Sequence, residues 1–224
     1  MIPGVKPAGI GIAVLMVAAL GVASASTAAA APMKPTITGT TEVTVPTEFV
    51  TEAAGKGVVV SAIEPATALS TSTSVAVQFP VTGPVGDGII RHRGGLSFAS
   101  DNTGITIEII NPSLTWGTGP SPVKRAQVTF TNAINGNLVT FFDVRNIDMA
   151  GKAGKPEKHG RHGWKRTDTG TFAGDLFVVN NPLAVKAFNE VMDAEILTPG
   201  AAFGEISSTY STTVYCKTKK LCQR

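Results

Sequence analysis

The sequence has little charge, few aromatic residues and no internal repeat. Charged residues make up 16% of the 224 positions, and the net charge is only +3. So small a surplus argues against a nucleic-acid-binding protein, because that function needs a concentrated basic face. No internal repeat is convincing enough to assign.

Motifs that mark common catalytic sites are missing as well. The chain contains no Gly-x-Ser-x-Gly, no His-Glu-x-x-His and no glycine loop that would cradle a phosphate. Its acidic residues are scattered along the sequence. Paired carboxylates for glycoside cleavage are defined by their separation in space, so a secreted hydrolase stays open as an alternative. The sequence favours a protein with no catalytic residues and no metal site.

The first 31 residues have the pattern of a secretory signal peptide. Lys6 is their only charged residue, Ile10–Leu20 is an apolar run, and small residues with Ala-x-Ala cleavage choices follow. An uncleaved membrane anchor is the alternative, although a span needs at least about 17 apolar residues. We expect cleavage near Ala25–Ala31 and export to the medium or the cell wall. The mature chain, 32–224, is then a single domain without a transmembrane segment.

Only two cysteines occur, Cys216 and Cys222, with five residues between them. In an exported protein such a pair predicts a disulfide, which here would close a small C-terminal loop. A metal site is the alternative, but no third or fourth ligand lies nearby in the sequence.

Short segments that alternate polar and apolar residues dominate the mature chain. Ser74–Phe79, Ile105–Ile109 and Phe203–Cys216 show this period of two, which is typical of strands with one buried face. Asn135-Gly136 predicts a hairpin, since a tight primed turn needs positive φ at its centre. About nine strands separated by Gly/Pro turns predict an all-β fold, as an antiparallel β-sandwich or a flattened barrel.

One short C-terminal helix is expected at Pro182–Ala194. Asn181 is a favoured N-cap and Pro182 suits the first helical position. The apolar face predicted for this helix consists of Leu183, Ala187, Phe188 and Val191.

Residues 149–171 are rich in Lys, Gly, His and Arg and lack periodicity, which predicts an exposed basic loop. His159 and His162 lie three apart and could hold a metal or contact an anion, and Trp164 could stack on a ring. The alternative is a solvated cationic loop. An anionic envelope polymer is the partner that such a loop would contact.

The stretch Gln78–Phe98 holds the first candidate for a ligand site. It consists of a strand end, a Gly/Pro turn and a second strand broken by paired glycines. In that second strand His92 shares the parity of apolar neighbours, while Arg91 and Arg93 point the other way. His92 is either a ligand-binding group on a buried face or a core histidine bonded to the backbone. A bulge at the paired glycines would reverse the parity beyond them.

Two blocks of the sequence resemble the haem-transport-associated (HtaA) domain family of secreted bacterial proteins. The first is Phe79-Pro80-Val81-Thr82-Gly83 followed by Gly88-Ile89-Ile90-Arg91-His92-Arg93-Gly94-Gly95-Leu96. The second is Ala184–Asn189 followed by Ala202-Phe203-Gly204. The resemblance implies haem binding through a tyrosine of an N-terminal segment, supported by a histidine from the strand motif. His92 occupies the histidine position, whereas the only tyrosines are Tyr210 and Tyr215, both in the last predicted strand.

Together these observations favour a secreted or envelope-associated, non-catalytic binding or structural protein of HtaA-like type, whose ligand is undetermined. A haem-binding or haem-relay module is the alternative, and a secreted hydrolase is the second alternative. The candidate ligand-binding residues are His92, Arg91, Arg93 and Tyr210. The expected partner is a small molecule, with haem as the candidate cofactor, or an envelope polymer.

Overall fold

The computed structural model describes residues 35–71, 74–83, 88–116, 125–160 and 163–223. All of them belong to one compact unit, Met33–Arg224, of the two units into which the chain divides. The expected signal peptide, 1–31, lies outside the described residues. Among the described residues, no helix is long and apolar enough to cross a membrane.

The described residues form twelve strands, two α-helices and one 3-10 helix. The strands are β1 (Thr36–Pro46), β2 (Val58–Ile63), β3 (Thr67–Ser70), β4 (Ser74–Pro80), β5 (Ile89–Arg91), β6 (Gly95–Ser100), β7 (Thr106–Trp116), β8 (Ala126–Asn132), β9 (Leu138–Lys152), β10 (Glu157–His159), β11 (Gly163–Val178) and β12 (Ala202–Cys216). The helices are α1 (Thr47–Gly55), α2 (Pro182–Met192) and η1 (Leu221–Gln223).

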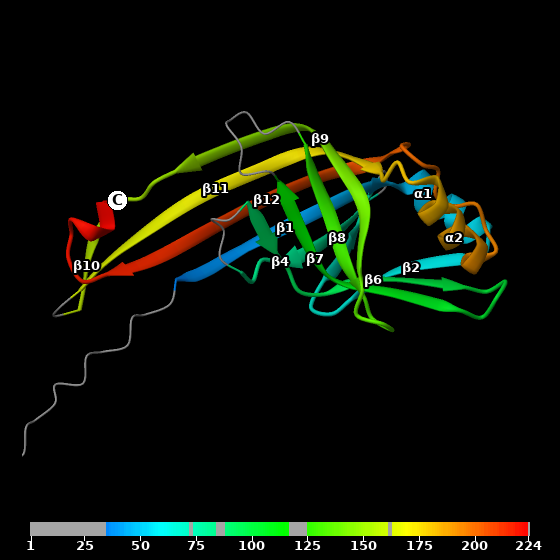
Figure 1. Cartoon of the computed structure of the whole chain (residues 1–224), viewed down its shortest axis with the longest axis horizontal. Helices are drawn as coiled ribbons and strands as arrows, with labels where there is room; N and C mark the ends of the chain where they lie inside the picture. The colour runs from blue at the N-terminus through cyan, green and yellow to red at the C-terminus, as the bar shows by residue number, and fades with distance from the viewer. Residues whose placement is uncertain (1–34, 72–73, 84–87, 117–124, 161–162, 224) are drawn as a thin grey trace, which may run out of the picture. The chain divides into compact units, whose positions relative to one another are not determined.

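All strands join one antiparallel sheet, in the order β2-β6-β7-β8-β9-β11-β12-β1-β4-β3, with β5 paired to β7 and β10 to β11. Figure 1 shows β7 and β8 crossing over β1, so the sheet folds back on itself. The all-β prediction is confirmed. Since one continuous sheet encloses the core, the flattened barrel describes it better than a sandwich of two separate sheets.

The core between the folded halves of the sheet is built around phenylalanine. Phe98 of β6 stacks on Phe141 of β9, with ring centroids 6.4 Å apart, and meets Phe188 of α2 edge to face at 5.2 Å. Phe142 and Phe203 join the same cluster, at 4.4 Å from one another. Aromatic pairs in such geometries stabilise a core beyond the area that they bury. These contacts hold α2 against the sheet.

The expectation of a single helix is wrong, because α1 (Thr47–Gly55) follows β1 directly. Pro46 ends the strand, and its fixed φ then leads into the helix, which has Glu48 in its first turn. Nine residues are too few for a clear helical period in the sequence. Phe49 anchors α1 to the core through an edge contact with Phe203 at 4.8 Å.

Helix α2 begins as predicted but buries a different face. The Asn181 side chain accepts a hydrogen bond from the Ala184 N–H, and Asp193 ends the helix in the left-handed conformation. Its buried residues are Val185, Phe188 and Met192, whereas Leu183 is 81% exposed and Val191 is 38% exposed. The predicted apolar face is therefore correct only at Phe188. The ring contacts of Phe188 with Phe98 and Phe141 turn this stripe toward the core.

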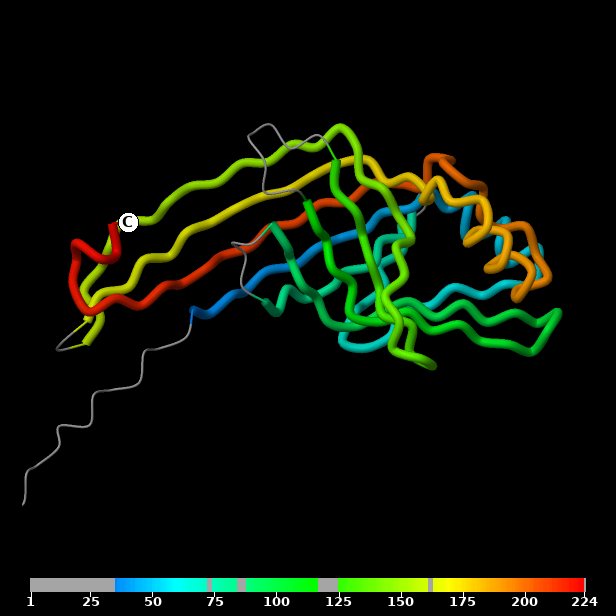
Figure 2. Tube along the Cα trace, viewed as in Figure 1, coloured from blue at the N-terminus to red at the C-terminus, as the bar shows by residue number. Residues whose placement is uncertain are grey.

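Residues 149–171 are not a loop, which corrects the sequence prediction. They contribute the end of β9, all of β10 and the first part of β11. Figure 2 shows the long strands β9, β11 and β12 continuing beyond the rest of this sheet toward the C-terminus. We call residues 150–160, 163–169 and 214–223 the basic extension. Both faces of these strands are exposed to solvent, so their polar, glycine-rich sequence does not alternate polar and apolar residues. The strands could therefore not be recognised from periodicity.

Candidate functional site

His92 follows β5 and turns its side chain into the interior, with 4% of the residue exposed. Ile90 and Leu96 are also buried, as the alternation predicts. Arg91 is half-buried and Arg93 is exposed. The paired glycines do not reverse the parity.

Gly94 makes the turn that sets His92 in place. Its φ is +90°, a conformation that residues with a side chain rarely adopt, and a Cβ at this position would lie 2.5 Å from the backbone nitrogen of Ala66. The His92 N–H donates to the Pro112 carbonyl at 3.0 Å. The turn and the neighbouring strand β7 together fix where the imidazole points.

Both ring nitrogens of His92 have hydrogen-bond partners. Nδ1 lies 2.9 Å from the Pro112 carbonyl oxygen, and Nε2 lies 2.6 Å from Oγ1 of Thr41 on β1. A hydrogen bond of 2.7 Å continues from Thr41 Oγ1 to Ser208 Oγ on β12. Thr41, His92 and Ser208 are three of the four buried polar residues among those described, and we call them the His92 network.

The direction of these hydrogen bonds depends on the charge of the ring. A carbonyl only accepts, so Nδ1 donates to Pro112. In a neutral ring Nε2 has no proton and accepts from the Thr41 hydroxyl, whereas in an imidazolium Nε2 donates to Thr41 Oγ1. In either state Thr41 Oγ1 also donates to Ser208 Oγ.

Burial decides between these two states. Desolvation lowers the pKa of His92 from 6.5 to about 4, and the hydrogen bond to the Pro112 carbonyl opposes that shift in part. The imidazole is therefore neutral at neutral pH. The Thr41 proton is then shared between His92 Nε2 and Ser208 Oγ, and no proton-accepting nitrogen is left free.

Tyr210 lies on β12 two residues beyond Ser208, so the two side chains share one face of the sheet. It pairs with Gly39 of β1 and Gly170 of β11. A Cβ on Gly170 would overlap the phenol ring, which means that the ring lies across that glycine. Burial raises the pKa of Tyr210, and its hydroxyl forms no hydrogen bond with another described residue. Tyr210 and His92 form no hydrogen bond and no ring pair with one another.

Sequence reasoning missed two members of the network, Thr41 and Ser208. Each had a weak signal, because each is a polar residue at an inward position of a predicted strand. Thr41 has the parity of Val43 and Val45, and Ser208 has the parity of Ile206. A polar side chain in such a row must find a partner when it is buried.

The predicted group of His159, His162 and Trp164 falls on the basic extension. His159 is exposed on β10, with its ring 5.1 Å from that of Tyr215, and His162 lies outside the described residues. Trp164 is half-buried on β11, with Lys219 Nζ 5.5 Å from its ring centroid. Of the described residues, no group of three or more His, Cys, Asp or Glu could hold a metal ion.

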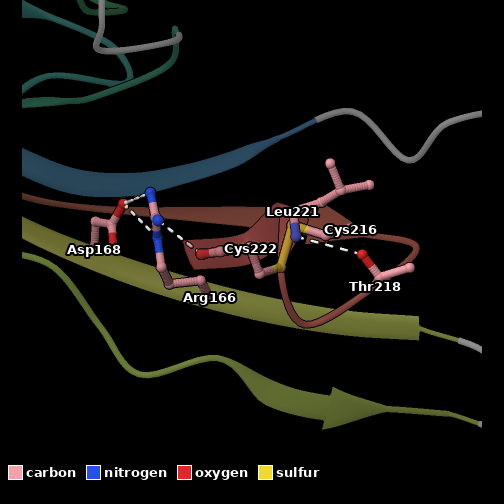
Figure 3. Close-up of a disulfide and its surroundings, with 6 residues drawn as sticks. All are labelled: Arg166, Asp168, Cys216, Thr218, Leu221 and Cys222. Atoms are coloured by element: carbon pink, nitrogen blue, oxygen red, sulfur yellow. Dashed lines mark hydrogen bonds and ion pairs between the residues drawn. A yellow bond between two sulfur atoms is a disulfide. The ribbon is translucent and has the colours of Figure 1, made fainter. Parts of the chain in front are cut away.

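The disulfide between Cys216 and Cys222 is present, with 5.5 Å between the two Cα atoms. Figure 3 shows Arg166 of β11 lying between this loop and Asp168. Its Nη1 donates to the Cys222 carbonyl at 2.7 Å, and its Nε and Nη2 donate to Asp168 Oδ2 at 3.1 and 2.8 Å. The disulfide and this arginine tie the C-terminal loop to the sheet.

A groove of about 950 Å³ beside α1 and α2 is lined by four acids, which is the arrangement that a hydrolase would need. These acids are Glu52, Glu190, Asp193 and Glu195. Glu52 and Glu190 each form an ion pair one helical turn away, with Lys56 and Lys186, and their side chains are both 65% exposed. A general acid must lie in an environment different from that of its partner carboxylate. Two exposed ion pairs, each on the surface of a helix, do not provide that difference. His92 does not line this groove.

No protein-family model and no curated protein sequence matches the chain. In structure it is similar to the heme binding protein HtaB from Corynebacterium glutamicum, with 11% identity, a TM-score of 0.42, and coverage of 81% of this chain and 98% of that chain. It is also similar to the C-terminal domain of HtaA from Corynebacterium glutamicum, with 11% identity, a TM-score of 0.47, and coverage of 80% and 99%.

The second of these structures carries the name of the family that the glycine motifs resemble. At these identities and TM-scores the likeness concerns the arrangement of the strands. The site of this chain is described by its own residues, and no ligand follows from the likeness.

Proposed function

We propose that this chain is a non-catalytic binding protein of the cell exterior, with the HtaA-like sheet as its scaffold. The His92 network carries the proposal. Burying polar groups costs free energy unless they are bonded to one another, so a linked set in an otherwise apolar core marks a position with a specific role. The disulfide supports export, because such bonds persist in oxidising compartments.

The binding face that we propose is the side of β1 and β12 that carries Thr41, Ser208 and Tyr210. Within the His92 network the hydrogen-bonding groups are already engaged with one another. The Tyr210 hydroxyl has no hydrogen bond to a described residue and is half-buried. It is therefore the group on this face that can donate to a ligand, and its ring adds apolar contact area.

Haem is the alternative ligand. The side chains on this face differ from the tyrosine and supporting histidine that the sequence resemblance implies. Haem iron is held by His, Cys, Met or Tyr side chains. His92 is buried with both nitrogens bonded, and its Nε2 meets a threonine, Thr41, where a tyrosine is expected. The raised pKa of Tyr210 favours the neutral phenol over the phenolate that would bind iron. A porphyrin on this face would be held by its ring rather than by its iron.

Absorbance titrations with haemin and with iron-free protoporphyrin IX test this proposal. We expect both porphyrins to bind with affinities within about threefold of one another, because no iron ligand is contributed. Tyr210→Ala should weaken binding by about tenfold, the loss expected for one hydrogen bond with its ring contacts. Tyr215→Ala is the matched control, since Tyr215 lies on the basic extension, and it should bind like the parent protein.

Two results would contradict the proposal. Binding of haemin alone, with protoporphyrin IX inert, would assign an iron ligand that the proposed face does not offer. Equal losses in the two tyrosine variants would remove Tyr210 from the site. Circular dichroism on each variant shows whether the fold is kept.

A further inference from the structure

The basic extension has an excess of positive charge that the rest of the sheet does not share. Residues 150–160, 163–169 and 214–223 contain eight Lys or Arg and two Asp or Glu, whereas the other described residues contain six and thirteen. The small net charge of the whole chain hides this segregation. A single-sign field of this kind attracts polyanions and raises their rate of association.

Both acids of the extension are already neutralised by cations. Glu157 forms an ion pair with Lys165 at 3.6 Å, and Asp168 forms one with Arg166 at 2.8 Å. Six further lysines are exposed and make no ion pair with another described residue; they are Lys152, Lys155, Lys158, Lys217, Lys219 and Lys220. Their charge is available to a partner.

The lysines near the C-terminus stand on a fixed frame. The disulfide closes the loop that carries Lys217, Lys219 and Lys220, and Arg166 holds that loop through the Cys222 carbonyl (Figure 3). Ligand-binding groups held on rigid elements lose less entropy on binding than groups on a free loop. The extension is therefore better prepared for binding than a solvated tail.

Cations lie on both faces of this part of the sheet. Lys158 of β10 lies opposite Trp164 of β11 in the strand pairing, so the two side chains share one face. Lys219 Nζ lies over the Trp164 ring on the same face. Lys165 is adjacent to Trp164 in β11 and so points to the opposite face, where Lys152 also lies because it pairs with Thr169. None of the described residues of β9, β11 and β12 within the extension is buried, which means that both faces are accessible.

We propose that the basic extension binds a linear phosphate polymer that runs along and around it. A planar bilayer meets one face at a time and gains affinity from inserted apolar side chains, and Leu221 is the one large exposed hydrophobic residue among those described in the extension. A flexible chain of phosphates reaches both faces. A nucleic acid would gain affinity by stacking its bases on aromatic rings. In the extension these rings are already covered, because Trp164 is half-buried beneath Lys219 and Tyr215 lies against His159.

Isothermal titration calorimetry of the chain from Met33 onward with long-chain inorganic polyphosphate tests the proposal. Affinity should fall steeply as salt is raised, because binding releases counterions. The double variant Lys217→Gln/Lys220→Gln should bind about tenfold more weakly at low salt, with a smaller salt slope. Lys56→Gln/Lys186→Gln removes the same charge beside α1 and α2, and it should bind like the parent.

Three results would overturn this inference. They are equal losses in the two double variants, affinity that does not change with salt, and binding to vesicles of equal parts phosphatidylglycerol and phosphatidylcholine without binding to polyphosphate. Porphyrin titrations do not involve these lysines, so the outcome is independent of the proposed function.

Discussion

The body of the sheet, residues 35–149 and 170–213, and the basic extension are stabilised in different ways. Every residue of the hydrophobic core belongs to the body, whereas Cys222 is the one buried residue among those described in the extension. The strands β11 and β12 run through both regions with a continuous ladder of pairs. The body is thus held by apolar burial and the extension by strand pairing, one disulfide and a few ion pairs.

The difference teaches where each region can bind a partner. A packed core positions buried groups such as the His92 network, and nearly all of its stability depends on apolar contacts. A single wet layer contributes little stability of its own, but it displays charge on two faces. Variants that separate the two regions make the comparison testable.

The largest effect is expected for Phe98→Ala in the body. Phe98 is 2% exposed and contacts the rings of Phe141 and Phe188, so the variant leaves a cavity and should lose about 3–5 kcal/mol of unfolding free energy. Trp164→Ala in the extension should lose less than about 1 kcal/mol of unfolding free energy, because Trp164 is only half-buried. Urea unfolding measures both, and equal losses would abolish the distinction between the regions.

The next effect is a dependence of stability on pH that comes from His92. Its pKa is about 4 in the folded protein and 6.5 in the unfolded chain, so between these values the unfolded chain binds more protons. Stability should be complete above pH 6.5 and fall as the pH is lowered toward 4, by up to about 1.4 kcal/mol per pH unit.

Urea unfolding at a series of pH values, compared between the parent and His92→Gln, isolates this contribution. The variant should lose the histidine-dependent slope in that window. His159→Gln is the control in the extension, and it should keep the slope of the parent because His159 is exposed. A parent slope that survives in His92→Gln would show that other groups cause it.

The smallest effect is expected for the disulfide. Cys216→Ser/Cys222→Ser opens a short loop at the end of the sheet, so the global free energy of unfolding should change by less than about 2 kcal/mol. Amide hydrogen exchange should instead rise locally, at the ends of β11 and β12. A global loss as large as that of Phe98→Ala would mean that the extension supports the body.

Period-two alternation in the sequence correctly predicted most of the strands in the body. It failed for residues 149–171, because strands that are wet on both faces need no apolar period. The cap at Asn181 located the start of α2, since capping depends on residues a few positions apart. The buried face of α2 and the existence of α1 were not predictable, because contacts with the distant Phe203 and Phe98 decide them.

For the candidate site, the sequence identified one member and the tertiary structure supplied the others. The alternation around His92 placed the imidazole in the interior as predicted. Thr41 and Ser208 lie 51 and 167 residues from their partners in the network, His92 and Thr41. The register of β1 against β12 brings them together, and that register depends on the whole sheet.

By itself, the sequence determined the all-β class, the helix start at Asn181, the disulfide pair and the inward direction of His92, because each depends on neighbours along the chain. Tertiary structure alone decided that a threonine meets the imidazole, that Tyr210 lies across a glycine, and that lysines cover two faces of one layer. Those outcomes depend on pairing between strands that are far apart in the sequence, which local periodicity does not encode.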